Sequence, residues 1–146
     1  MIKSFEIDHT RLKKGVYVSR VDGDITTIDI RVCAPYEDVP MTSAAAHTIE
    51  HVIADLLRNS RYKEKVIYFG PMGCLTGFYL LLKGQSDVEN VADMLVRPAF
   101  EYLMQVNEIP GSSQKECGNY SLHDLKLAKK YAKKFLKSRW RLDYPK

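Results

Sequence analysis

The most constraining feature of this sequence is the segment His47-Thr48-Ile49-Glu50-His51, which has the pattern H-x-x-E-H. Residues three and four positions apart share one face of an α-helix, so His47, Glu50 and His51 should project from the same side. The opposite side of that helix carries large apolar residues, namely Ile49, Val52, Ile53, Leu56 and Leu57. The pattern therefore predicts an amphipathic helix over residues 43–58 that packs on the rest of the molecule through its apolar side.

Two histidines at positions i and i+4 can bind one divalent metal, with the carboxylate between them available for acid–base chemistry. The alternative interpretation is a helix that carries two surface histidines by chance. Two ligands do not make a catalytic site, so a third must come from elsewhere. Cys117 is a candidate because a thiolate binds zinc or ferrous iron well and Gly118 lets the backbone approach closely. The alternative for Cys117 is a small buried apolar residue.

The other two cysteines differ in their surroundings. Cys74 follows Gly73 in an expected turn, where a thiol beside a cation can act as a base or nucleophile, although packing is an equally good interpretation. Cys33 lies at a strand end without chemical partners, and we assign it no role. An odd number of cysteines, two of them in glycine-containing loops, fits reduced thiols better than a disulfide framework.

The order of the expected elements defines the fold class. Alternation and turn residues predict four strands, over residues 16–20, 25–32, 66–69 and 76–83. Helical patterns predict three helices, over residues 43–58, 86–106 (kinked at Pro98) and from Ser121 onward. Strand pairs joined by hairpins favour an α+β fold, in which helices pack on one face of an antiparallel sheet of about four strands. The 146 residues suit one domain spanning 1–146.

Charge and hydrophobicity indicate whether the protein binds nucleic acid or a membrane. The net charge is +4, and residues 126–141 contain lysine and arginine but no acidic residue. We interpret this stretch as the solvated face of an amphipathic helix, and we expect no nucleic-acid partner. The apolar runs are too short to cross a bilayer, so we expect no membrane association. Because the N-terminus has no signal-peptide pattern, we expect a cytoplasmic protein.

Several short motifs, in order along the chain, resemble the LuxS-type S-ribosylhomocysteine lyases, which make the precursor of autoinducer-2. The matching pieces are Ser4-Phe5-Glu6-Ile7-Asp8-His9, Asp29-Ile30-Arg31, His47-Thr48-Ile49-Glu50-His51, Pro71-Met72-Gly73-Cys74, Thr76-Gly77-Phe78-Tyr79, Glu108-Ile109-Pro110-Gly111 and Lys115-Glu116-Cys117-Gly118. Each piece alone is weak, but together they are highly specific. The resemblance implies cleavage of S-ribosylhomocysteine to homocysteine and 4,5-dihydroxy-2,3-pentanedione by two carbonyl shifts and a β-elimination.

The resemblance also implies roles for individual residues. It makes His47, His51 and Cys117 the ligands of one divalent metal per chain, with Fe²⁺ expected in the cell and Zn²⁺ or Co²⁺ as replacements. It makes Glu50 and Cys74 the acid–base pair, and it makes Ser4, His9 and Arg31 substrate-binding residues. It further implies a homodimer whose active sites lie at the interface. Because the polar side of the metal helix needs a cover, we expect the N-terminal arm with Ser4 and His9 to be donated by the second chain.

The sequence departs from the family pattern at one functional stretch. The family usually has Asp-Ile-Ser before Pro-Met-Gly-Cys, whereas this chain has Tyr68-Phe69-Gly70. In the family this stretch lies near the amino-acid end of the substrate, so a variant substrate preference or a lower activity is one expectation. Two alternatives remain: a metallopeptidase of the inverted-zincin type, which shares H-x-x-E-H, and an inactive family member that serves as a binding module.

Overall fold

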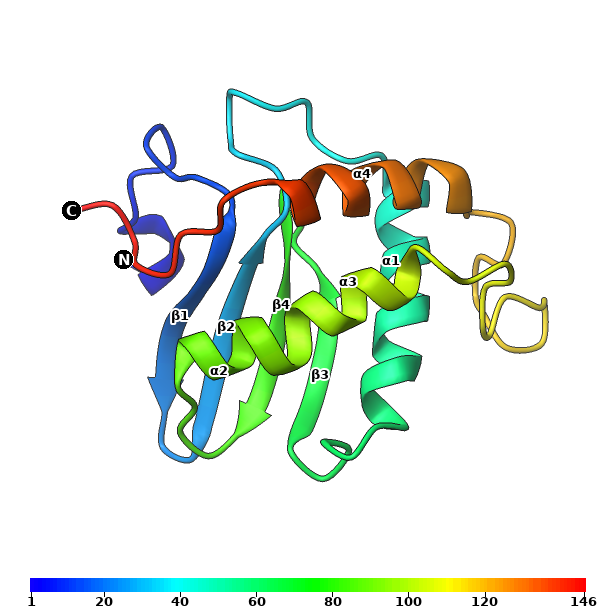
Figure 1. Cartoon of the computed structure of the whole chain (residues 1–146), viewed down its shortest axis with the longest axis horizontal. Coiled ribbons are helices and arrows are strands. Elements are labelled where there is room, and N and C mark those ends of the chain that lie inside the picture. Colours follow the sequence, from blue (N-terminus) through cyan, green and yellow to red (C-terminus); the bar gives the residue numbers. More distant parts are fainter.

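The computed structural model describes residues 1–146 and contains one four-stranded antiparallel sheet (Figure 1). The strand order is β1-β2-β4-β3, with β1 at Gly15–Asp22, β2 at Ile25–Arg31, β3 at Val66–Pro71 and β4 at Gly77–Lys83. All three neighbouring pairs are antiparallel. The expected α+β class and the expected sheet are therefore confirmed.

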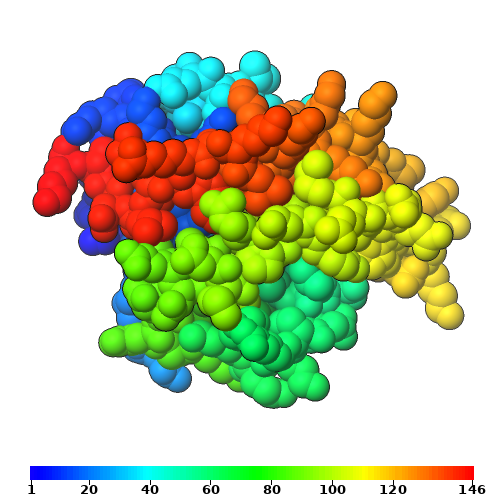
Figure 2. All heavy atoms as spheres, viewed as in Figure 1, coloured from blue at the N-terminus to red at the C-terminus, as the bar shows by residue number.

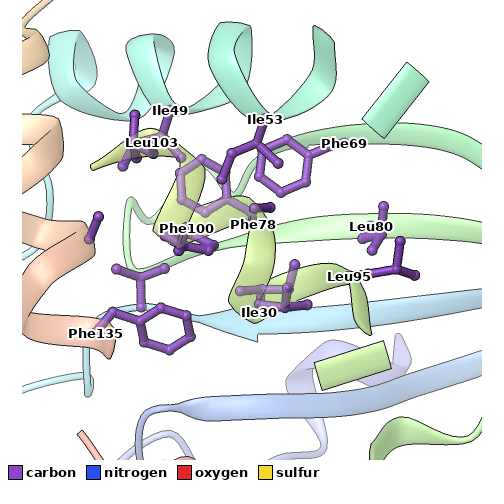
Figure 3. Packing of buried hydrophobic residues seen from close by; sticks show 14 of the residues in the cluster. Ile30, Ile49, Ile53, Phe69, Phe78, Leu80, Leu95, Phe100, Leu103 and Phe135 are labelled. Carbon is purple, nitrogen blue, oxygen red and sulfur yellow. The ribbon is translucent and has the colours of Figure 1, made fainter. Parts of the chain in front are cut away.

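Six helical segments connect and cover this sheet. The helices are η1 (Lys3–Phe5), α1 (Ser43–Arg58), α2 (Val88–Val91), η2 (Ala92–Val96), α3 (Arg97–Leu103) and α4 (Leu125–Lys137). In Figure 1, α2, α3 and α4 cross one face of the sheet, and α1 runs beside β3. Apolar side chains from α1, α3 and α4 meet the same face of the sheet in one core (Figure 3).

Strand alternation divides the residues of β2 between the two faces of the sheet. Ile28 and Ile30 point into the core and are at most 1% exposed. Asp29 and Arg31 alternate with them and therefore point to the opposite face, away from the helices. The register places Tyr79 of β4 directly beside Asp29 on that opposite face. This second face becomes important for the candidate site.

Helix α1 forms as its periodicity predicts. Thr42 is the N-cap, and its side chain accepts a hydrogen bond from the backbone N–H of Ala45. Ile49 and Ile53 are almost completely buried and lie next to Phe69 and Phe78 in Figure 3. Burial of an aliphatic side chain of this size contributes about 1.5–3 kcal/mol, so the apolar side fixes which side of α1 remains available for chemistry.

The second expected helix is divided into three pieces. A π-helical turn, η2, separates α2 from α3, and the backbone N–H of Arg97 bonds the carbonyl of Ala92. Pro98 follows at once, and its ring would clash with the carbonyl four residues earlier in a regular α-helix. The wider π turn accommodates the proline. The first piece also begins later than the expected start at Ser86, because its N-cap is Asp87, whose side chain makes no capping hydrogen bond.

The last helix also begins later than expected. Asp124, rather than Ser121, is the N-cap of α4, and its side chain accepts a hydrogen bond from the backbone N–H of Leu127. Ser121 is excluded from the helix because the chain just before α4 is bonded to α1: the backbone N–H of Asp124 donates to Thr48 Oγ1 at 2.9 Å. Tertiary contacts therefore set this boundary. The space-filling view (Figure 2) places the C-terminal residues against the N-terminal part of the chain.

None of the helices has both the length and the apolar composition that a membrane crossing requires.

Candidate metal centre and active site

The structure brings the three expected donors of the metal site together. The Sγ atom of Cys117 lies 3.5 Å from Nε2 of His47 and 3.7 Å from Nε2 of His51. Zinc bonds of about 2.0–2.1 Å to nitrogen and 2.3 Å to sulfur, at a tetrahedral angle, place such donors about 3.6 Å apart. The separations therefore match those that one divalent ion would impose.

Hydrogen bonds to backbone carbonyls orient both imidazoles. His47 Nδ1 lies 2.6 Å from the carbonyl oxygen of Leu122, and His51 Nδ1 lies 2.9 Å from that of Pro110. A carbonyl only accepts, so each Nδ1 carries the proton and donates it. Each Nε2 is then left with a free lone pair directed toward Cys117. This arrangement is typical of metal-binding histidines, whose second nitrogen is commonly bonded to a carbonyl or carboxylate.

The long loop between α3 and α4 contributes Cys117 and the two backbone carbonyls that accept from the histidines of α1. Gly111 has φ = +63°, a backbone conformation that residues with a side chain rarely adopt. A Cβ at this position would lie 3.5 Å from His51 Nδ1. Further along the loop, the backbone N–H of Asn119 donates to Cys117 Sγ at 3.4 Å. This bond suits a sulfur that carries negative charge. The loop is thus shaped around the two histidines of α1.

Glu50 has no structural partner. Its side chain makes no hydrogen bond or ion pair in the structure. It lines an open hollow of about 400 Å³ together with His51, Ala54, Arg58 and Gly111, among others. Glu50 is therefore a carboxylate without a structural partner, and it lines the same open hollow as His51, one of the three donors.

His123 belongs to the same cluster but was missed in the sequence. One of its ring nitrogens lies within 4.8 Å of the donor atoms of His47, His51 and Cys117. The sequence could have suggested His123 as a member of the cluster, because it is only six positions after Cys117 and is one of four histidines in the chain. Spacing alone did not indicate that the intervening turn brings it back to α1.

The orientation of His123 argues against its being a fourth ligand. Its ring stacks on that of His47, with centroids 4.2 Å apart and planes 14° apart. A nitrogen lone pair lies in the plane of its ring, so two nearly parallel stacked rings cannot both direct one at the same ion. His123 Nδ1 lies 3.0 Å from Thr48 Oγ1, while Nε2 is buried without a partner. Burial lowers the pKa of His123, and the two neighbouring histidines lower it further, which favours a neutral ring packed against His47.

A second group of expected residues lies around the turn between β3 and β4. Arg31 Nη1 donates to Thr76 Oγ1 at 2.7 Å and lies 4.0 Å from Cys74 Sγ. Cys74 is exposed, and its Sγ lies 3.1 Å from Thr76 Oγ1. The next residue, Leu75, has φ = +61°, which is uncommon for a residue with a side chain. The turn thus presents a free thiol beside a guanidinium.

The N-terminal residues divide between two places. Ser4 lines a hollow of about 250 Å³ together with Tyr79, which lies beside Asp29 in the sheet. His9 instead bonds the carbonyl of Ile7 through Nδ1 at 2.8 Å, and it makes no hydrogen bond to another candidate residue. The structure therefore places Ser4 with the second group and leaves His9 in its own loop.

Within one chain the two groups remain separate. No hydrogen bond or ion pair connects the group of His47, Glu50, His51 and Cys117 with the group of Ser4, Arg31 and Cys74. Arg31 points to the face of the sheet opposite the helices, whereas α1 packs on the core face. One chain therefore presents two partial sites.

Tyr68 marks the departure from the expected family pattern. Its side chain is 49% exposed, and it occupies the space beside Gly70. A Cβ at residue 70 would lie within 1.9 Å of Tyr68 Oη, so glycine leaves room for the tyrosine in this orientation. The aromatic ring stands where the family usually has an aspartate.

Fold and donor set together define a class: a small α+β protein with a His/His/Cys cluster that could hold a divalent metal, and with an unpaired carboxylate in the hollow next to His51. The profile of the S-ribosylhomocysteinase (LuxS) family matches residues 2–144. The chain therefore belongs to this family, and with it to the carbon–sulfur lyases.

Individual relatives agree with this assignment. The S-ribosylhomocysteine lyase of Borreliella burgdorferi (strain ZS7) is 50% identical over 141 residues, which cover 92% of this chain and 89% of the relative. That of Finegoldia magna is 48% identical over 140 residues, covering 92% and 88%. That of Clostridium acetobutylicum is 44% identical over 155 residues, covering 99% and 98%. The metallopeptidase alternative has no support among these relatives.

Proposed function

We propose that this protein cleaves S-ribosylhomocysteine to homocysteine and 4,5-dihydroxy-2,3-pentanedione, the precursor of autoinducer-2, within the methyl cycle. The family and the names of the relatives support this substrate. The structural observation that carries the proposal is the convergence of two Nε2 lone pairs on Cys117 Sγ, at 3.5 and 3.7 Å.

The chemistry of the substrate explains why such a site needs several proton transfers. A thioether is a poor leaving group until a carbonyl can stabilise the carbanion next to the breaking C–S bond. In the open-chain sugar the carbonyl starts at C1 and has to move to C2 and then to C3. β-Elimination then releases homocysteine. Each shift removes a proton from one carbon and returns a proton to its neighbour, and no net oxidation is required.

Two residues of this chain are suited to carry those protons. Glu50 is an unpaired carboxylate in the hollow next to His51, and Cys74 is an exposed thiol beside Arg31. General acid–base catalysis needs each group within hydrogen-bond reach of the atom it serves, so both must approach the same sugar. Arg31, Ser4 and His9 would hold the substrate's polar groups. Tyr68 would alter the recognition of the homocysteine end.

The donor set fits a divalent metal. His47, His51 and Cys117 would hold it, leaving a fourth tetrahedral position for the substrate. When bound, the ion would act as a Lewis acid on the sugar's carbonyl oxygens. Nitrogen and sulfur donors suit Fe²⁺, Zn²⁺ and Co²⁺, and we propose Fe²⁺ as the ion in the cell with the other two as replacements.

Assembly of a complete site requires a second chain. The two partial sites are not connected within one chain, and several apolar side chains are exposed, including Ile2, Phe5 and Tyr68. We propose a homodimer in which the α1 group of one protomer faces the β-turn group of its partner, and a two-fold axis would then create two equivalent sites. We place the protein in the cytoplasm, with neither nucleic acid nor a membrane as a partner.

Release of a free thiol tests the proposed reaction. Purified metal-loaded protein is incubated with S-ribosylhomocysteine, thiol is measured colorimetrically, and the dione is identified by mass spectrometry. Wild-type protein should release one thiol per dione. Glu50→Gln and Cys74→Ala should keep the metal and lose activity by ~10²–10⁴-fold, because each removes one acid–base group.

The result separates the alternatives. If the wild-type protein binds the substrate but releases no thiol, the protein is an inactive family member that serves as a binding module. If Cys74→Ala retains the full rate, Cys74 has only a packing role and the acid–base assignment is wrong.

A further inference from the structure

The C-terminal segment, residues 139–146, returns to the sheet and is bonded there. The backbone N–H of Arg141 donates to the carbonyl of Lys14 at 3.0 Å, and the N–H of Val16 donates to the carbonyl of Arg141 at 2.9 Å. These bonds form an isolated parallel bridge between Gly15 and Arg141. A Cβ at Gly15 would lie 2.1 Å from the carbonyl oxygen of Arg141, so glycine is what permits this approach. Figure 1 shows the segment passing β1 beside the N-terminal residues.

Tyr144 follows this anchor and reaches a buried carboxylate. Its ring stacks on that of Tyr17, with centroids 4.5 Å apart and planes 10° apart. Its hydroxyl donates to Asp29 Oδ2 at 2.7 Å. The stack holds the ring, and the single hydrogen bond directs the hydroxyl.

Asp29 connects Tyr144 to the second group of candidate residues. Asp29 and Arg31 form a two-point ion pair, with Nε–Oδ1 at 3.2 Å and Nη2–Oδ2 at 2.7 Å. Both residues are at most 2% exposed. The remaining nitrogen of the guanidinium, Nη1, is the one that reaches Thr76 and Cys74. A continuous path therefore runs from the C-terminal segment to the thiol.

We propose that Tyr144 is a positioning residue that holds the Asp29 carboxylate, and through it the Arg31 guanidinium, in the orientation that the Cys74 site requires. This inference rests on the proposed function of Arg31 and Cys74. It gives the C-terminal segment a role in the reaction beyond covering the sheet.

The energetics favour a specific role for the hydroxyl. A buried carboxylate is stable only when charged and polar partners satisfy its oxygens. Oδ2 of Asp29 accepts from both Arg31 and Tyr144, whereas Oδ1 accepts from Arg31 alone. Burial raises the pKa of Tyr144, and the charge of Asp29 raises it further, so the hydroxyl remains a donor at any physiological pH. Without it, the carboxylate can rotate and carry the guanidinium with it.

The chain offers a matched control for removing this hydroxyl. Tyr144→Phe keeps the stacked ring and removes only the bond to Asp29. Tyr17→Phe removes the hydroxyl of the other ring in the same stack. That hydroxyl donates to the carbonyl of Lys13 at 2.6 Å and not to Asp29, so its loss leaves the Asp29 carboxylate bonded as before. Both variants are compared with wild type in metal content, melting temperature, kcat, KM and the rate at which iodoacetamide alkylates Cys74, followed by peptide mass spectrometry.

We expect Tyr144→Phe to lose about tenfold in kcat/KM, the loss that corresponds to one weakened hydrogen bond to a charged group. The alkylation rate of Cys74 should also change, because the guanidinium beside the sulfur is held less firmly. Metal content should stay at the wild-type level. Tyr17→Phe should match wild type in both kcat/KM and alkylation rate.

Two outcomes would overturn the inference. One is a Tyr144→Phe protein that melts at a lower temperature but keeps the wild-type kcat, KM and Cys74 alkylation rate. The C-terminal segment would then stabilise the fold without positioning Arg31. The other is an equal loss in both variants, which would assign the effect to the stack. Failure of the proposed function itself is distinguishable, because the wild-type protein would then release no thiol. The alkylation comparison would still decide whether Tyr144 acts on the Cys74 site.

Discussion

At the scale of single residues, the candidate metal centre depends on the proton positions of two imidazoles. The carbonyls of Leu122 and Pro110 accept from the Nδ1 atoms of His47 and His51, so the Nε2 atoms have no proton to interfere with a metal. A carbonyl turned away at either position would allow the other tautomer and weaken the site. His123 stabilises this arrangement by stacking on His47.

This geometry predicts which residues determine metal content. Wild-type protein should carry about one divalent ion per chain, and Cys117→Ala and His51→Ala should lose most of it, because two donors hold an ion far more weakly than three. His123→Phe should retain about one ion, since phenylalanine can stack but cannot coordinate. Elemental analysis after exhaustive dialysis measures all three variants.

A His123→Phe protein without metal would show that the His123 ring nitrogen coordinates the ion. Full metal content in both Cys117→Ala and His51→Ala would refute the three-donor assignment.

At the scale of elements, one carboxylate holds the loop before α1 against two distant parts of the chain. Asp38 Oδ2 accepts from the backbone N–H of Ala34 at 2.7 Å, and it also contacts Lys14 of the segment before β1. Its other oxygen accepts from Lys134 of α4 at 2.9 Å. Burial raises the pKa of Asp38, but these three partners lower it by more, so the net pKa lies below the ordinary value.

Asp38→Asn should therefore lower the free energy of unfolding by about 1–2 kcal/mol at pH 7, because it weakens hydrogen bonds to a charged group. The folded-state pKa of Asp38 is depressed, so its stabilising effect is present above the unfolded pKa of about 4 and is lost as the pH falls through the folded value. Urea denaturation of both proteins at pH 7 and pH 3 tests this. The difference between them should shrink at pH 3, and an unchanged difference would mean that the carboxylate charge contributes nothing.

At the scale of the whole molecule, the sheet separates two groups of candidate residues that the proposed reaction would need together. Glu50 belongs to the α1 group, and Cys74 belongs to the group on the turn between β3 and β4. A two-fold dimer that pairs the first group of each protomer with the second group of its partner would complete both sites. Inactive variants with lesions in different groups can then complement each other.

Mixing Glu50→Gln chains with Cys74→Ala chains should restore activity. In a mixed dimer, one site receives both lesions and the other receives neither. Random exchange of equal amounts makes half of the dimers mixed, so about a quarter of wild-type activity should return. The matched control mixes Cys74→Ala with Arg31→Ala, whose lesions lie in the same group, and it should stay inactive.

Subunit exchange is verified by native mass spectrometry of a tagged chain. If exchange is complete and the Glu50→Gln and Cys74→Ala pair stays inactive, each site is built within one chain.

Local sequence patterns were sufficient to predict the main elements and the two histidine donors on α1 that the structure brings close to Cys117. The helical spacing of His47, Glu50 and His51 opposite an apolar stripe predicted α1, and the structure places the stripe in the core. Alternation in β2 predicted a strand with two different faces. These features follow from the periods of helix and strand, which act over a few residues. The choice of Cys117 as the third donor was predicted from its thiol chemistry and from the family resemblance.

Other features were decided only by the tertiary structure. His123 joins the cluster, and α4 begins at Asp124, because the chain before α4 is bonded to Thr48, which lies more than 70 positions earlier. Tyr144 likewise bonds Asp29, 115 positions earlier, because the C-terminal segment packs against the sheet. The division into two partial sites likewise depends on which side of the sheet each strand residue faces once the helices cover the other. Contacts of this kind depend on how distant segments pack, and the periodicity of a local segment carries no information about its distant partners.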